Sequence, residues 1–170
     1  MNRLLTAVCC IAVASVPAFG QKATAKSNTT DQQFVGFAAQ TDMVEANLGQ
    51  MAQTNGSAQD VKDFGQTLTT DHTSDYQQLK AAASQPSLEV ASSIDAEHNK
   101  AMIDPFAKLT GAAFDKKFAA DMVAGHTKAI ALYKKEAAQT QNPALKSYAE
   151  AALPVLQKHL DAAKKLGKSK

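Results

Sequence analysis

The chain has 170 residues, of which 45% are hydrophobic, and a formal net charge of +2 at pH 7. This length fits one domain with a sizeable core. Basic and acidic residues nearly balance and form no run of five like charges, which argues against a nucleic-acid partner, because such proteins usually carry a concentrated basic face.

Residues 1–20 have the pattern of a secretory signal peptide. A short charged start precedes an apolar run from Leu4 to Val16, and the small residues around Phe19 suit a signal peptidase. That run is shorter than a membrane-spanning helix, and no later segment approaches ~18 apolar residues, so the mature chain has no predicted transmembrane segment. Both cysteines, Cys9 and Cys10, fall inside the peptide. We therefore expect a secreted protein without thiols, which excludes a Cys-rich zinc site.

Residues 21–30 are rich in Ser, Thr, Lys and Ala, and this composition predicts a flexible linker. A folded domain over residues 31–167 is expected to follow. Its first helix is predicted to begin at Asp31, a favoured N-cap residue, and to end near Thr54. Apolar residues recur along one face of this segment at helical spacing.

Ser57 is expected to cap a second helix that ends near Ser84. Residues 85–92 include a proline and have no helical period, so they begin a long crossover. The crossover carries a shorter predicted helix over about 94–109, which Pro105 should interrupt.

A third long helix is predicted over about 112–140, and a fourth from Pro143 to about Leu166. Asn142 before Pro143 is a strong start signal, because a capping side chain is followed by proline at the first helical position. No segment predicts a strand convincingly. Two helical hairpins joined by a long crossover indicate an all-α four-helix bundle with one extra short helix.

Four side chains with metal-binding chemistry occupy the apolar faces of the four long helices at matching depths. They are Glu45, His72, His126 and His159. Each lies 14 to 16 residues from the start of its helix, which is ~21 to 24 Å along the axis. Antiparallel packing would bring all four to one level of the core, where imidazole or carboxylate is costly unless it is paired or bound to metal.

One interpretation is a single metal ion held by these four side chains. Imidazole and carboxylate suit Zn²⁺, Fe²⁺, Mn²⁺ or Cu²⁺, and bundles build such sites from facing helices. Asp71, Asp75 and Asp121 lie nearby in the sequence and are candidates to orient the rings. The alternative is a polar core layer in which the histidines bond to Glu45, to tyrosine hydroxyls or to buried water.

Other catalytic signatures are missing from the sequence. No Glu stands three residues before a His, so the Glu-x-x-His motif of di-iron bundles is absent. The sequence also has no Gly-x-Ser-x-Gly and no glycine-rich phosphate loop. No catalytic or organic-cofactor-binding residue is therefore predicted, and His98 on the crossover is expected at the surface.

Several short motifs, spread along the domain, are characteristic when taken together. They are Glu45-Ala46-x-Leu48-Gly49 within Phe34 to Ala52, Val61-Lys62-x-Phe64, Asp71-His72, Gly111-Ala112-Ala113-Phe114-Asp115, His126-x-x-Ala129 and Leu153-Pro154-x-Leu156-x-x-His159-Leu160.

From Asp31 to Leu166 the chain resembles the secreted bacterial ferritin-like proteins of domain-of-unknown-function family 4142. The resemblance implies a ferritin-like four-helix bundle in the periplasm or cell envelope of a Gram-negative bacterium, and it carries no established activity. Gly125 departs from the pattern, because members often have an acid before the third-helix histidine.

The leading hypothesis is a periplasmic binding protein, with little or no catalysis, that holds one metal ion through the four core side chains. A metal-dependent oxidoreductase is the second hypothesis, and it needs an open coordination position and access for substrate. The third is an envelope-stress or structural protein whose polar layer fixes the register of the helices. The sequence does not identify the metal or the protein partners, and it is compatible with a homodimer.

Overall fold

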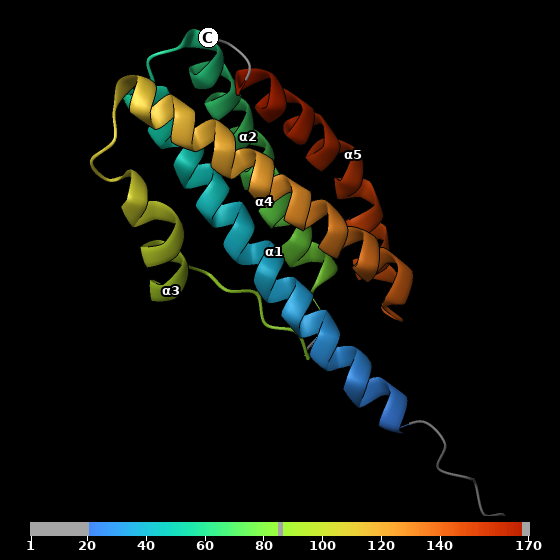
Figure 1. Cartoon of the computed structure of the whole chain (residues 1–170). Coiled ribbons are helices and arrows are strands. Elements are labelled where there is room, and N and C mark those ends of the chain that lie inside the picture. The colour runs from blue at the N-terminus through green and yellow to red at the C-terminus, as the bar shows by residue number, and fades with distance from the viewer. Residues whose placement is uncertain (1–20, 85–86, 168–170) are drawn as a thin grey trace, which may run out of the picture.

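The computed structural model describes residues 21–84 and 87–167, with side chains from Thr30 onward. Within these residues the chain is helical and contains no strand. Four long helices form the body of the molecule (Figure 1). They are α1 (Gln21–Asn55), α2 (Gln59–Ala82), α4 (Gly111–Gln139) and α5 (Pro143–Leu166). The predicted signal peptide, residues 1–20, lies outside the described residues.

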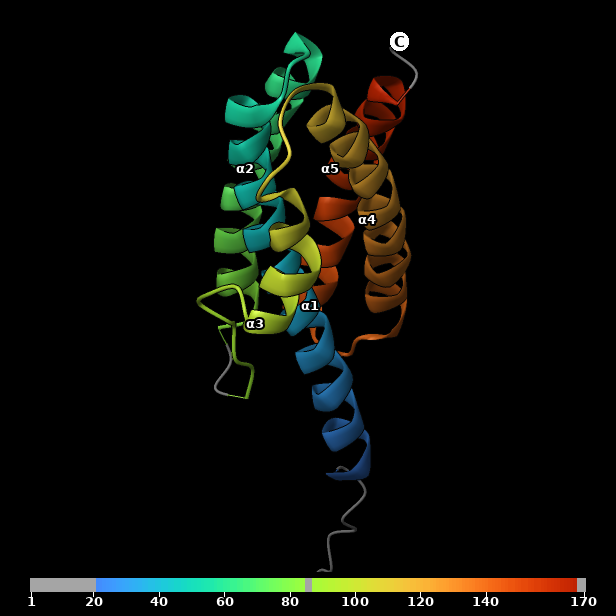
Figure 2. The ribbon, with the colours of Figure 1, turned by 60° about the vertical axis from the view of Figure 1, so that its left-hand side comes forward.

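The long helices pair as two hairpins. α1 packs chiefly against α2, and α4 packs chiefly against α5. Between the hairpins, a crossover returns along the bundle through α3 (Ala96–His98), a π-helical turn (Asn99–Ile103) and a 3-10 turn (Asp104–Phe106). Figure 2 shows this segment in front of α1, and the π-helical turn contacts α1. The predicted all-α bundle with one long crossover, the ferritin-like layout, is therefore confirmed.

The start of α5 follows the predicted capping pattern. The Asn142 side-chain oxygen accepts hydrogen bonds from the backbone N–H groups of Ala144 at 3.0 Å and Leu145 at 3.3 Å. Pro143 follows at the first helical position. A backbone N–H there would have no partner within the helix, and proline has no N–H to leave unpaired. Local chemistry alone thus fixes where this helix begins.

The first helix begins earlier than the predicted cap at Asp31. α1 begins at Gln21, so residues 21–30 are helical and Asp31 lies inside the helix. No glycine or proline in this segment opposes helix formation. The Asp31 carboxylate instead accepts a hydrogen bond from the Thr140 hydroxyl at 3.0 Å, beyond the end of α4. Figures 1 and 2 show the first turns of α1 projecting past the bundle.

The predicted cap at Ser57 is wrong. Ala58 is the N-cap of α2 and has no capping side chain. The backbone N–H groups of Ser57 and Ala58 each donate to the Asp115 carboxylate at 3.0 Å. A residue of α4 therefore satisfies the start of α2, and this bond joins the two hairpins at one end of the bundle.

Two glycines allow the backbones of α1 and α2 to touch. A Cβ atom built on Gly49 would lie 2.5 Å from the Gly65 carbonyl oxygen, and one built on Gly65 would lie 2.6 Å from the Gly49 carbonyl oxygen. Neither position can take a side chain unless the helices move apart. This close approach sets the distance between α1 and α2 near Glu45 and His72.

Two apolar clusters fill the core on either side of the polar layer. One cluster includes Val35, Tyr133 and Leu145, and the other includes Phe64 and Phe118. Each long helix contributes residues to both clusters, and its metal-ligand candidate (Glu45, His72, His126 or His159) lies along the helix close to where the two contributions meet. The matched depths inferred from the sequence are therefore realised in three dimensions.

None of the described helices combines the length and apolarity that are needed to cross a bilayer.

Candidate metal centre

The structure brings together all four side chains predicted from the sequence. Glu45 Oε2 lies 2.9 Å from His72 Nε2 and 3.2 Å from His126 Nε2. His126 Nε2 is in turn 3.2 Å from His159 Nδ1. The four residues are at most 5% exposed. One atom from each of the four long helices thus faces a common point in the core.

The outward nitrogen of each imidazole contacts a hydrogen-bond acceptor at 2.9 Å. His72 Nδ1 contacts the Asp42 carboxylate, and His126 Nδ1 contacts the Met122 carbonyl oxygen. His159 Nε2 contacts the Asp71 carboxylate. Since carbonyl and carboxylate oxygens only accept, the ring protons belong on these outward nitrogens. The inward nitrogen of each neutral ring is then a lone pair.

Charge in the site is concentrated on Glu45 and His72. Burial lowers the pKa of His72, but the Glu45 and Asp42 carboxylates outweigh burial and raise it to about 10. Burial raises the pKa of Glu45, yet the surrounding histidines lower it overall. Burial lowers the pKa of His126, and it lowers the pKa of His159 to about 4. Without metal, therefore, His72 is the favoured site for a proton, between the Glu45 and Asp42 carboxyl groups.

This pair is not aligned as a hydrogen bond. His72 Nε2 and Glu45 Oε2 are 2.9 Å apart, yet both are buried without a hydrogen-bond partner of proper geometry. Buried polar atoms are nearly always satisfied, and exceptions mark strain, function or a bound ion. Both atoms border the same point as the inward nitrogens of the other two rings.

The donor set and its spacing fit one transition-metal ion. The three imidazoles offer nitrogens that lie within 4.8 Å of one another. Ligands held at ~2.0–2.1 Å by one tetrahedral ion lie about 3.3 Å apart, so small side-chain movements would complete the site. The Asp42 and Asp71 carboxylates and the Met122 carbonyl supply the outer hydrogen bonds that fix such rings.

The three aspartates predicted to orient the rings have different roles. Asp71 does contact His159, as expected. Asp75 instead accepts a hydrogen bond from the Tyr148 hydroxyl at 2.7 Å. Asp121 pairs with Lys117 at 2.8 Å near the surface, because five residues of helix turn it away from His126. Of the three aspartates, only Asp71 contacts an imidazole ring directly.

Two ring-orienting groups were missed by sequence reasoning. Asp42 lies three residues before Glu45 on the same helix face, and this spacing could have identified it. Burial is the main reason that the Asp42 pKa rises to about 7. The Met122 carbonyl carries no signal in the side-chain pattern. His98, predicted at the surface, contacts Asp95 at 2.9 Å, and its side chain is 40% exposed.

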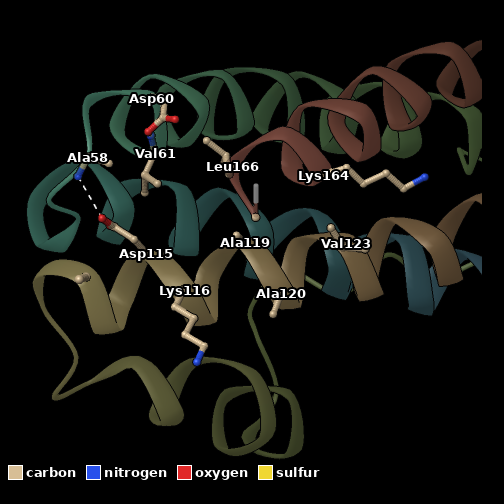
Figure 3. A pocket seen from close by; sticks show the side chains of 12 residues that line it. Ala58, Asp60, Val61, Asp115, Lys116, Ala119, Ala120, Val123, Lys164 and Leu166 are labelled. Carbon is tan, nitrogen blue, oxygen red and sulfur yellow. Dashed lines mark hydrogen bonds between the residues drawn. The ribbon is translucent and has the colours of Figure 1, made fainter. Parts of the chain in front are cut away.

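A narrow cavity reaches the site along the seam between α2 and α5. It has a volume of about 70 Å³ and is lined in part by Asp71, His72, Asp75 and His159. A much larger apolar cavity, about 920 Å³, lies at the far end of the bundle between α2, α4 and α5 (Figure 3). None of the four converging residues lines this larger cavity.

One comparison with known proteins identifies the chain's family. The sequence matches the family described as Domain of unknown function (DUF4142) over residues 16–166. Comparisons with curated proteins and with solved structures gave no match. The family match spans all four long helices, the crossover and every residue of the candidate centre. The chain therefore belongs to the DUF4142 family, as its motifs predicted.

Proposed function

We propose that this protein binds one divalent transition-metal ion in the core of its bundle. The ligands are Glu45 Oε2, His72 Nε2, His126 Nε2 and His159 Nδ1. The observation that carries the proposal is the set of outward hydrogen bonds, which turn the inward nitrogens of three imidazoles toward the Glu45 carboxylate. Metal-binding histidines typically have such an arrangement.

A polar layer without metal is the competing explanation, and two observations favour the metal. A layer that served only packing would align Glu45 with His72, but these two atoms lie close together without hydrogen-bond geometry. In addition, the Nδ1 of His159 and the Nε2 of His126 are 3.2 Å apart, although their outward bonds leave neither with a proton to share. A cation between the four atoms would relieve both conflicts.

Imidazole nitrogen dominates the donor set, which favours Cu²⁺ or Zn²⁺ over Mn²⁺ in vitro by the Irving–Williams order. Fe²⁺ also accepts this mixture of ligands. Binding must displace the proton on His72, because a metal ligand has to be deprotonated. We further propose that the protein holds this ion in the periplasm or cell envelope, on the strength of the signal-peptide pattern in residues 1–20.

Metal should stabilise the fold, because a ligand that binds only the native state shifts unfolding by mass action. Zn²⁺ or Cu²⁺ at about 100 times its Kd should add about 2.7 kcal/mol, which corresponds to a rise in Tm of roughly 5–10 °C for a domain of this size. Thermal melts and titration calorimetry measure the effect. One bound ion per chain is the expected stoichiometry.

His159→Ala should remove most of this rise, and His98→Ala should retain it. Both changes remove one imidazole, but only His159 belongs to the converging set. Circular dichroism of the metal-free variants checks that each is folded. A melt that does not respond to any of the four metals would support the polar layer instead, and loss of binding only in His98→Ala would move the metal to the crossover.

A further inference from the structure

A second cavity adjoins the candidate centre on the side opposite the α2–α5 seam. It lies between α1, α4 and the crossover, and its volume is about 110 Å³. Its lining includes Phe37, Glu45, His98, Gly125 and Lys128. We call it the Glu45 cavity. None of the outward hydrogen bonds that hold the three imidazoles uses a residue of this lining.

The Glu45 carboxylate lies at the boundary between this cavity and the histidines. Its Oε2 atom lies among the imidazole nitrogens. Its Oε1 atom is the only neighbour within 4 Å that a Cβ atom on Gly125 would meet, at 3.1 Å. Glu45 therefore has one oxygen beside the imidazoles and the other beside Gly125. The missing side chain at Gly125 keeps the space beside Oε1 open.

The cavity wall carries one lysine ammonium group. Lys128 holds it 5.4 Å from the centre of the Phe37 ring, and His98 of the crossover also belongs to the lining. Asp95, which contacts His98 Nδ1, is half exposed and does not belong to the lining. Once a divalent ion neutralises Glu45, the remaining local charge is positive and favours an anion.

The volume limits the size of what can enter. A water molecule occupies about 30 Å³ of liquid, so the cavity has room for roughly three or four waters. A ligand of about two to four heavy atoms fits this space.

We propose that the Glu45 cavity admits a small inorganic anion, which binds the core metal beside Glu45. This inference rests on the metal site proposed above. Four protein ligands leave a coordination position in the five- and six-coordinate geometries that Cu²⁺, Fe²⁺ and Mn²⁺ adopt. The cavity reaches Glu45, which is one of the four proposed ligands, and Lys128 supplies a charge that attracts the anion.

Azide is a suitable probe, because it is a small anion and its coordination to Cu²⁺ gives a new absorption band. The purified protein is loaded with one Cu²⁺ per chain, and azide is titrated while absorption is followed. We expect a saturable new band. Metal stoichiometry is measured first, so absence of copper binding overturns the metal site itself, whereas a copper-loaded protein that gives no azide band overturns only the anion site.

Two variants test the route, and each has a matched control. Gly125→Ala puts a methyl group into the cavity and should weaken azide binding at least threefold. Gly36→Ala makes the same change in α1, where a new Cβ meets nothing within 4 Å, and should leave it unchanged. Lys128→Gln should weaken azide binding roughly three- to tenfold at low salt, as expected for one partly screened charge. Lys134→Gln, an exposed position on the same helix, is its control.

Equal azide affinity in Gly125→Ala and Lys128→Gln and in their controls would overturn the proposed route. If Gly125→Ala weakens copper binding itself, the azide affinity of Lys128→Gln decides whether the anion enters by this cavity, because that substitution adds no atoms beside Glu45.

Discussion

At the residue scale, the decisive feature is the partner of each histidine's outward nitrogen. Asp42, Met122 and Asp71 each accept one ring proton, and together they determine which nitrogen faces the core. A histidine without such a partner can rotate or change tautomer, and it then loses its value as a ligand. The acceptors therefore matter nearly as much as the four converging atoms.

Asp71→Asn should weaken Zn²⁺ or Cu²⁺ binding by about 10- to 100-fold, the usual cost of losing a carboxylate behind a metal-bound imidazole. Asp71 is 41% exposed, so the variant should still fold. Asp121→Asn is the matched control, because Asp121 lies on the neighbouring hairpin and pairs with Lys117 away from the imidazoles. Competition titrations with a chromophoric chelator measure both affinities, and equal values in the two variants would refute the role of Asp71.

Glu136 provides a pH-dependent test outside the metal centre. Burial, followed by the nearby Asp31 charge, raises its pKa to about 7. The folded state therefore binds more protons than the unfolded state between pH ~4.5 and ~7, and stability falls as pH rises through this window. Glu136→Gln should remove this loss of stability. The free energy of unfolding of the variant, relative to that of wild type, should therefore rise by about 1–3 kcal/mol between pH 5 and pH 8.

Urea midpoints of the metal-free proteins at these two pH values measure the difference. The exposed Glu150→Gln on α5 is the control and should follow wild type. A Glu136→Gln variant whose advantage does not grow with pH would mean that Glu136 titrates normally in the folded protein.

At the element scale, the contact between α1 and α2 depends on Gly49 and Gly65. Each glycine lies against the carbonyl oxygen of the other helix. Interhelical distance is set by the side chains at the crossing, so a pair of glycines gives the closest approach. The pair lies about one turn beyond Glu45 and two turns before His72, and it therefore controls how far apart these two ligands sit.

Gly65→Ala should destabilise the protein by about 1–3 kcal/mol, because the new methyl group overlaps backbone that cannot move freely. Gly36→Ala should have the opposite sign and stabilise by about 0.5–1 kcal/mol, since alanine favours helix and its Cβ meets open space. Denaturant unfolding of the two variants measures both signs. A neutral Gly65→Ala would mean that α1 and α2 separate at little cost.

At the scale of the whole molecule, the candidate centre joins two hairpins that contact each other sparingly. α1 and α2 form one closely packed pair, α4 and α5 form the other, and the contacts between pairs are fewer. Each hairpin contributes two of the four converging residues. One metal ion would thus act as a cross-link at mid-height, in addition to the Asp115 bond at one end.

Metal should therefore slow hydrogen exchange in both hairpins together. At about 100 times its Kd, the ion should raise protection of the slowest amides about a hundredfold, because the opened state loses its ligands. Mass spectrometry of α2 and α5 peptides, with and without Zn²⁺, measures this, and His159→Ala should show no such increase. Slowing confined to one hairpin would contradict a site shared by all four helices.

The sequence by itself determined the helices, their order and the depth of the four polar residues. Apolar spacing and local signals such as Asn142-Pro143 are interactions between near neighbours in the chain, so they can be read without the fold. The cap of α2 could not be read in this way. Ser57 and Ala58 bond to Asp115, so a distant residue decided it.

The tertiary structure also decided the chemistry of the centre. Helical period placed Glu45, His72, His126 and His159 at one level, but it could not tell which ring nitrogen faces inward. That choice depends on Asp42, Asp71 and a backbone carbonyl, and two of these three acceptors come from a different helix than the ring they hold. An aspartate reaches a ring on another helix only if each helix is rotated about its axis to the right angle. That angle is defined only by the assembled core.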